Sequence, residues 1–246
     1  MKVLIACEES QEVCKAFRAK GHEAYSCDIQ MCSGGHPEWH ICNDVLDIIN
    51  GNTDFFTGDG AVHTVNKWDL LIAHPPCTYL SNVATRHHSL RCTTIDKINI
   101  RTLKRIEAMD FFMKFVNADC GKIAIENPVG VMNTAYRKPD CIVQPYQFAA
   151  NEHDVANYVQ KKTCLWLKNL PPLVPTNELP KPNPFGFTKS GKPINFEEAH
   201  GKIPGLACDS DSAKARSKTF LAIAHAMAEQ WGNIKEDNDD SDERGF

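Results

Sequence analysis

The stretch Trp68-Asp69-Leu70-Leu71-Ile72-Ala73-His74-Pro75-Pro76-Cys77 decides the fold that this sequence predicts. Its first seven residues form a short, nearly continuous apolar run, which is typical of a parallel strand buried on both faces. Pro75 and Pro76 end that strand, because proline lacks a backbone N–H and fixes φ. Cys77 therefore lies where a parallel strand ends, and open α/β sheets bind their ligands at this edge. Most cysteines are small buried hydrophobes, so this position alone leaves a nucleophile and a structural thiol both open.

Strand and helix patterns alternate on both sides of this stretch. Residues 10–21 predict a helix with Ser10 as its N-cap and Gly21 at its end. Residues 98–116 have the apolar spacing of a longer helix. Further strands are predicted at residues 2–7, 23–27, 122–126 and 163–168. Strands separated by helices imply a parallel sheet with right-handed crossovers, so the sequence predicts an α/β fold.

Reactive or charged side chains follow the predicted strands at the points where they end. Cys7 and Glu8 follow the first strand, and Asp28 follows the second. Glu126 ends the strand that comes after the long helix. Because the carboxyl ends of parallel strands meet at one edge of a sheet, these side chains and Cys77 are predicted to share one site.

The second half of the chain is less regular and predicts a small insertion. Residues 171–205 are rich in proline, glycine and asparagine, which is typical of loops, whereas residues 213–231 have a helical pattern. We therefore expect one α/β domain made of residues 1–169 and 213–232, an irregular insertion at 170–212, and an acidic tail at 233–246. The composition of the tail predicts that it is disordered.

Composition narrows the class of protein. Hydrophobic and charged contents of 42% and 24% are ordinary for a globular protein. No apolar run approaches the roughly 20 residues needed to cross a bilayer, so we expect no membrane partner. The eleven cysteines are an odd number with no export signal before them, which favours free thiols in a reducing cytoplasm.

The net charge has one local source. Residues 234–246 carry six carboxylates and two cations, which sums to −4, and the whole chain also carries −4. The rest of the chain is therefore formally neutral (−4 minus −4). A neutral body can still bind a nucleic acid if its cations are clustered on one surface.

Cys77 and Glu126 together indicate a particular chemistry. A thiolate can add to C6 of a pyrimidine ring when an acid bonded at N3 offsets the negative charge that develops there. The adduct makes C5 nucleophilic, so that C5 can attack a methyl group. The parts required are a cysteine, a glutamate in a dry site and a pocket for a methyl donor.

In these features the chain resembles the DNA cytosine-5 methyltransferase family, in a compact form of the kind that bacteriophages carry. Cys77 lies in Ala-His-Pro-Pro-Cys-Thr-Tyr-Leu-Ser, which is similar to the family's nucleophile motif. Glu126 lies in Ile-Glu-Asn-Pro-Val-Gly, which is similar to the Glu-Asn-Val motif whose glutamate contacts the cytosine. The resemblance covers most of residues 1–231. It implies a Rossmann-like S-adenosylmethionine-dependent methyltransferase fold, a base flipped out of DNA, and the cytoplasm of a bacterium or phage-infected cell.

The resemblance also implies where S-adenosylmethionine binds. Asp28 matches the acidic residue that binds the ribose hydroxyls, and Asp44 matches the residue that reaches the adenine amino group. Residues 216–220 match the last motif of the family, which returns to the cofactor pocket. The implied cofactor residues are Cys7, Glu8, Asp28, Ile29, Asp44, Pro75 and Ser217.

A second set of residues is implied at the DNA. The loop at residues 82–91 corresponds to the region that closes over the flipped base. Its cations continue into Lys97, Arg101, Lys104 and Arg105, which either track phosphates or form a solvated helix face. The implied DNA residues are Pro76, Ser81, Arg86, Arg91, Asn127, Lys162 and Lys189. We expect a monomer.

Two departures from the family pattern leave alternatives open. The glycine-rich first loop is replaced by Ala-Cys-Glu-Glu-Ser-Gln at residues 6–11, and the Gln-x-Arg-x-Arg motif appears only as Gln-Lys-Lys-Thr-Cys at 160–164. Lys162 is the cation expected to replace the arginine. One alternative is a pyrimidine C5-modifying enzyme with a different donor or a free-nucleotide substrate. Another is a catalytically silent DNA-binding or cofactor-binding relative.

Five possible metal ligands lie close together between residues 27 and 42. They are Cys27, Cys32, His36, His40 and Cys42. Their spacing contains no Cys-x-x-Cys knuckle, so we predict ordinary loop residues and no metal.

Overall fold

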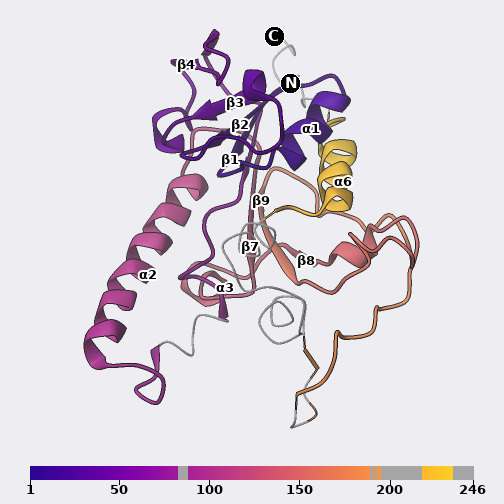
Figure 1. The fold of residues 1–246 in the computed structure, drawn as a ribbon. Coiled ribbons are helices and arrows are strands. Elements are labelled where there is room, and N and C mark those ends of the chain that lie inside the picture. The colour runs from indigo at the N-terminus through magenta and orange to yellow at the C-terminus, as the bar shows by residue number, and fades with distance from the viewer. Residues whose placement is uncertain (83–87, 189–190, 192, 195–217, 235–246) are drawn as a thin grey trace, which may run out of the picture.

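The computed structural model describes residues 1–82, 88–188, 191, 193–194 and 218–234, and every structural statement below concerns these residues. Seven strands form one sheet in the order β3-β2-β1-β6-β7-β9-β8 (Figure 1). Their bounds are β1 Lys2–Ala6, β2 Glu23–Asp28, β3 His40–Cys42, β6 Leu70–Ala73, β7 Ile123–Pro128, β8 Cys141–Val143 and β9 Thr163–Lys168. The predicted mixed α/β fold with a mostly parallel sheet is confirmed.

The sheet reverses its strand order next to β1. Strands β1, β2 and β3 follow one another in one direction, and β6 and β7 continue on the other side of β1, all in parallel. Only β9 runs against its neighbours β7 and β8. In open α/β sheets such a reversal opens a crevice at the carboxyl ends of the strands, and ligands bind there. The reversal lies between β1 and β6, next to the predicted site.

Helices cover both faces of the sheet. Along β1, Val3 and Ile5 pack toward α1 (Glu12–Ala19) and α6 (Leu221–Trp231), whereas Leu4 and Ala6 pack on the opposite face, toward α2 (Ile95–Val116). This alternation follows from the two-residue period of a strand, and both faces are apolar because both are covered. The result is a three-layer arrangement with the sheet in the middle (Figure 1).

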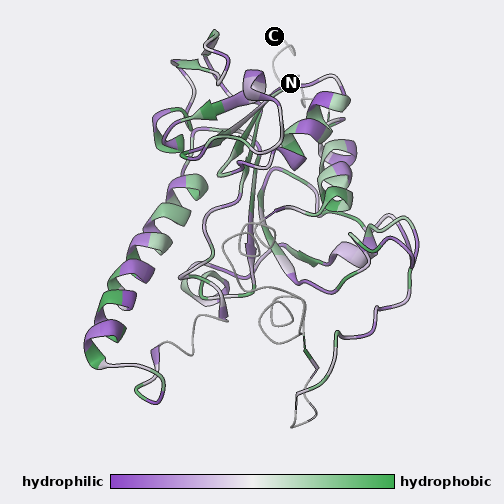
Figure 2. Ribbon diagram, in the orientation of Figure 1, coloured by the Kyte–Doolittle hydropathy of each residue, from purple (hydrophilic) through white to green (hydrophobic). Residues whose placement is uncertain are grey.

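Helix α2 extends well beyond the sheet (Figure 1). Its last turns bury Phe112 and Phe115, whereas Ile95, Ile100 and Leu103 in its first half are exposed. Hydrophobic and hydrophilic colours alternate along the whole helix (Figure 2). The sequence predicted a start near residue 98, and the helix begins at Ile95.

Several small elements complete the described fold. They are the hairpin β4 (Thr53–Phe56) and β5 (Val62–Val65), the short helix α3 (Met132–Ala135), and the 3₁₀ turns η1 (Pro37–Trp39), η2 (Val45–Asp47) and η4 (Pro145–Gln147). The hairpin and β8 were not predicted from the sequence. The predicted insertion at 170–212 and the helical pattern at 213–231 lie partly outside the described residues. The predicted acidic tail lies almost wholly outside them.

Candidate active site

The loops that carry Cys77 and Glu126 are joined to each other. Ala73 of β6 pairs with Ile125 of β7, so both motifs leave the sheet at the same level. Beyond the strands, the Asn82 N–H donates to the Val129 carbonyl at 3.1 Å, and the Val131 N–H donates to the Leu80 carbonyl at 2.8 Å. Two segments far apart in the chain are thereby held as one unit. Cys77 is exposed on this unit, and Glu126 is half-buried.

Two further contacts tighten the same junction. Gly130 lies so close to the other loop that a Cβ there would be 2.8 Å from the Leu80 carbonyl carbon and 3.0 Å from the Ser81 Cα, which explains why glycine is needed. The buried side chain of Asn127 donates Nδ2–H to the Pro75 carbonyl at 2.7 Å. Asn127 is 2% exposed, so in this structure it fixes the proline loop.

His74, which no motif singled out, lies beside Glu126. Its Nδ1 is 3.3 Å from Glu126 Oε2, and its side chain is only 8% exposed. Its other ring nitrogen, Nε2, is buried and has no hydrogen-bond partner among the described residues. A signal for this residue was present, because His74 is a polar residue at the end of an apolar run, directly before the two prolines.

A small cavity on the other side of Glu126 contains cations. Its lining residues are Glu126, Lys161, Thr163, Lys218, Thr219, Phe220 and Ile223. The predicted cation, Lys162, is exposed and does not line this cavity, whereas Lys161 does. Alternation along an extended segment puts residues 161 and 163 on the same side, and this pattern would have identified Lys161. Cys164 is buried, and burial raises the pKa of its thiol to about 11.

The loop after β1 keeps a tight path without glycine. Cys7 and Gln11 have φ angles of 60° and 61°, in the left-handed region that non-glycine residues occupy at a cost of about 1–3 kcal/mol. The predicted N-cap, Ser10, was wrong, since α1 starts after Gln11 and no N-cap side chain bonds to it. Strained backbone of this kind is concentrated at functional sites.

Glu8 serves as the polar cap of α1. Its Oε1 accepts from the Val13 N–H at 2.7 Å, and its Oε2 accepts from the Cys14 N–H at 3.1 Å. Burial raises the pKa of Glu8, although His74 and the two N–H bonds oppose that rise. Both carboxylate oxygens of Glu8 are therefore bonded to the first turn of α1, next to the predicted cofactor residue Cys7.

The other predicted cofactor residues gather at the ends of β1, β2 and β3. Burial, and then the nearby charges of Asp28 and Asp44, raise the pKa of the Cys7 thiol, which indicates that the three side chains lie together. Asp28 Oδ1 accepts from the Gln30 N–H, and Asp44 Oδ1 accepts from the Leu46 N–H. Ile29 is 78% exposed beside them. Pro75, at the end of β6, is buried.

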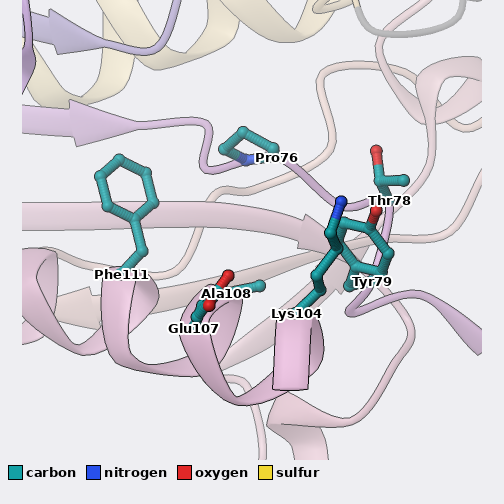
Figure 3. A pocket seen from close by; sticks show the side chains of 7 residues that line it. All are labelled: Pro76, Thr78, Tyr79, Lys104, Glu107, Ala108 and Phe111. Carbon is teal, nitrogen blue, oxygen red and sulfur yellow. The ribbon is translucent and has the colours of Figure 1, made fainter. Parts of the chain in front are cut away.

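A larger cavity separates the proline loop from α2. It has a volume of about 560 Å³ and is lined by Pro76, Thr78, Tyr79, Lys104, Glu107, Ala108 and Phe111 (Figure 3). Arg105 donates Nε–H to the Tyr79 carbonyl at 3.0 Å, and the Arg101 guanidinium and Lys104 ammonium lie 5.0 and 5.8 Å from the Tyr79 ring centroid. The cations of α2 therefore surround the loop that follows Cys77.

Of the remaining predicted site residues, two are described by the structure and three are not. Arg91 is exposed, and Ser81 forms the bridge to Gly130. Arg86, Lys189 and Ser217 lie outside the described residues. Within the described part of the chain, no cluster of three or more side chains is arranged to bind a metal ion.

The comparisons with known proteins do not place this chain in a family. A scan against models of protein families finds no match, and no curated protein matches the sequence. No helix in the described part of the chain is both long and apolar enough to span a membrane.

Proposed function

We propose that this protein is a DNA cytosine-5 methyltransferase that transfers a methyl group from S-adenosylmethionine to C5 of a flipped cytosine. The observation that carries the proposal is the junction of the two motif loops. Of the pair that pyrimidine activation requires, Cys77 follows β6 and Glu126 lies near the end of the adjacent strand β7, and three sets of hydrogen bonds join the two segments. The junction lies beside the reversal of strand order, where α/β sheets bind ligands.

The strand order supports the same proposal. If the seven strands of this sheet are numbered in chain order, leaving out β4 and β5, their order in the sheet is 3-2-1-4-5-7-6. Only the seventh strand, β9, is antiparallel to its neighbours. An antiparallel strand inserted near the end of an otherwise parallel sheet is the arrangement we expect of the proposed methyltransferase fold. A purely dinucleotide-binding sheet would continue in parallel to its sixth strand.

In the proposed reaction, the residues at the junction divide the chemistry between them. The Cys77 thiolate adds to C6 of the cytosine, and the electron pair that moves into the ring is stabilised by Glu126 at N3. S-adenosylmethionine, when bound, supplies an electrophilic methyl group that the enriched C5 attacks. Loss of the C5 proton to solvent and expulsion of the Cys77 thiolate then restore the aromatic ring.

The charges at the cofactor end favour a cationic ligand. Asp28 and Asp44 lie close to Cys7, and the next residue in the chain, Glu8, is buried. A sulfonium and an α-amino group are both positive and would be stabilised by these carboxylates. The exposed Ile29 offers an apolar surface for an adenine ring. This half of the site therefore supports S-adenosylmethionine as the donor.

The cations of α2 provide the proposed DNA contacts. Lys97 and Arg101 are four residues apart, and Lys104 and Arg105 follow Arg101 by three and four residues, so all four lie on one side of the helix. The same side of α2 carries the buried Phe112 and Phe115 nearer its end. Arg101 and Lys104 lie over the ring of Tyr79, two residues after Cys77. A row of cations beside the nucleophile suits the phosphates on either side of a flipped nucleotide.

The test compares two cysteine variants of the full-length protein. Transfer of labelled methyl from S-adenosylmethionine to unmethylated DNA is measured for the unmodified protein, for Cys77→Ser and for the control Cys92→Ser. Cys92 is also exposed but lies on the segment before α2. We expect no transfer by Cys77→Ser and undiminished transfer by Cys92→Ser. Equal transfer by Cys77→Ser would overturn the proposed mechanism.

Mass spectrometry of the DNA bases after expression separates the remaining alternatives. A mass gain other than one methyl group at cytosine would indicate a different donor. Modification of free nucleotide, with none in DNA, would indicate a different substrate. Binding of S-adenosylmethionine in a calorimeter with no product of either kind would indicate a catalytically silent relative.

A further inference from the structure

His74 lies between the two halves of the proposed site. The register Ala6–Ala73–Ile125 across β1, β6 and β7 means that the next residues, Cys7, His74 and Glu126, lie side by side at the carboxyl edge. The His74 N–H donates to the Ala6 carbonyl at 2.9 Å, which fixes its backbone to β1. Its ring approaches Glu126 on one side and lowers the pKa of Glu8 on the other.

The hydrogen bonds of His74 differ from those of a structural histidine in the same chain. His40 is also buried, and both of its ring nitrogens are bonded, Nδ1 to Ser26 Oγ at 2.9 Å and Nε2 to the Gln30 carbonyl at 2.8 Å. His74 uses Nδ1 alone, while the buried Nε2 has no partner among the described residues. An unsatisfied buried polar atom is destabilising, so this nitrogen does not contribute to the stability of the fold.

We propose that His74 is a positioning residue for Glu126, an inference that rests on the function proposed above. With its proton on Nδ1, His74 donates to Oε2 of the carboxyl group and leaves Oε1 for the cytosine ring. The bond fixes the rotation of the carboxyl group and prevents Glu126 from turning toward Lys161 and Lys218 in the neighbouring cavity. A carboxyl group that is free to turn would meet N3 in the productive orientation only part of the time.

Replacements of His74 separate positioning from structural support. His74→Leu keeps much of the volume, removes the donor and also removes the unpaired Nε2. His74→Asn keeps an N–H donor near the position of Nδ1. For His74→Leu we expect unchanged or higher stability, kcat lowered about 10- to 100-fold and an unchanged KM for S-adenosylmethionine. For His74→Asn we expect kcat to recover by about tenfold relative to His74→Leu.

A second measurement isolates the step in which Glu126 acts. DNA labelled with tritium at C5 of cytosine loses the label, even without cofactor, when the Cys77 adduct forms, C5 takes up a proton from solvent, and the tritium is then lost from C5 as the Cys77 thiolate is expelled. We expect His74→Leu to slow this exchange as much as it slows methyl transfer. The matched control is His63→Leu, since His63 is a part-buried, hydrogen-bonded histidine on the β4–β5 hairpin, away from the junction.

The outcomes distinguish failure of this inference from failure of the proposed function. If the unmodified protein neither releases tritium nor transfers methyl, the function itself is wrong. If the unmodified protein is active and His74→Leu exchanges tritium at the same rate, His74 does not position Glu126. If His74→Leu and His74→Asn lose stability and activity in proportion, His74 is structural and the inference is also overturned.

Discussion

Replacement of Gly130 by alanine should uncouple the two motif loops. A Cβ at this position would lie 2.8 Å from the Leu80 carbonyl carbon and 3.0 Å from the Ser81 Cα, with the Leu80 oxygen closer still. Backbone atoms cannot rotate away as a side chain can, so the loops must separate. Separation carries Leu80–Asn82, and with it the segment after Cys77, away from the loop after Glu126.

The magnitude follows from the bonds that separation breaks. The Asn82–Val129 and Val131–Leu80 backbone hydrogen bonds both cross the junction, and each contributes about 1 kcal/mol net. Incomplete rehydration of the exposed polar groups adds about another 1 kcal/mol. We therefore expect Gly130→Ala to lower the free energy of unfolding by about 3 kcal/mol. For a domain of this size the melting temperature then falls by roughly 6–12 °C.

The assay combines urea unfolding with methyl transfer, and Gly121→Ala is the matched control. A Cβ at Gly121 would meet nothing within 4 Å, so this variant has the same composition without the clash. Gly130→Ala should lose stability and most of its activity, whereas Gly121→Ala should change the unfolding free energy by less than about 0.5 kcal/mol. Equal stability of the two variants would refute the junction as the feature that holds Cys77 and Glu126 together.

Two further predictions concern the cofactor end. Burial raises the pKa of Glu8 above its ordinary value of 4.5, so the folded protein loses stability as the pH rises past 4.5. Glu8→Gln lacks this titrating group. The difference in unfolding free energy between the unmodified protein and Glu8→Gln should therefore shrink or change sign as the pH rises. Urea unfolding at a series of pH values checks this, and a difference independent of pH would contradict it. Asp28→Asn should weaken S-adenosylmethionine binding about tenfold or more in calorimetry, because it removes a charge-assisted hydrogen bond, while Asp47→Asn, an exposed control, should not.

The sequence predicted the strands that carry the site because their signals are local. Each strand is a short apolar run, and each site residue follows such a run, so Cys7, Asp28 and Glu126 could be placed at the sheet edge before the structure was known. The β4–β5 hairpin gave no comparable signal. Its strands alternate buried and exposed residues over only four positions, and its packing against Tyr25 and Trp68 depends on contacts distant in sequence.

The roles of the site side chains were harder to predict than their positions at the sheet edge. A polar side chain that could bind a ligand can also bond to a nearby backbone group. Glu8 lies where a cofactor ligand was expected, yet the α1 N–H groups are nearer and bond to both of its oxygens. Asn127 was expected at the DNA, yet the Pro75 carbonyl takes its amide. Lys161, and not its neighbour Lys162, lines the cavity beside Glu126, and a motif match by residue order carries no information about which side of the segment faces Glu126.

The loop after β1 also limits which cofactors this sheet can bind. A dinucleotide places its pyrophosphate on the N-terminal N–H groups of the first helix. In this chain Glu8 accepts from the Val13 and Cys14 N–H groups, and each such charge-assisted bond is worth about 1.5–3 kcal/mol. Displacing Glu8 would therefore cost about 3–6 kcal/mol, or roughly two to four powers of ten in affinity. Repulsion from Asp28 would add to that cost. The loop thus keeps a tight path without glycine, through the left-handed Cys7 and Gln11, and the bonds of Glu8 oppose an anion at the start of α1.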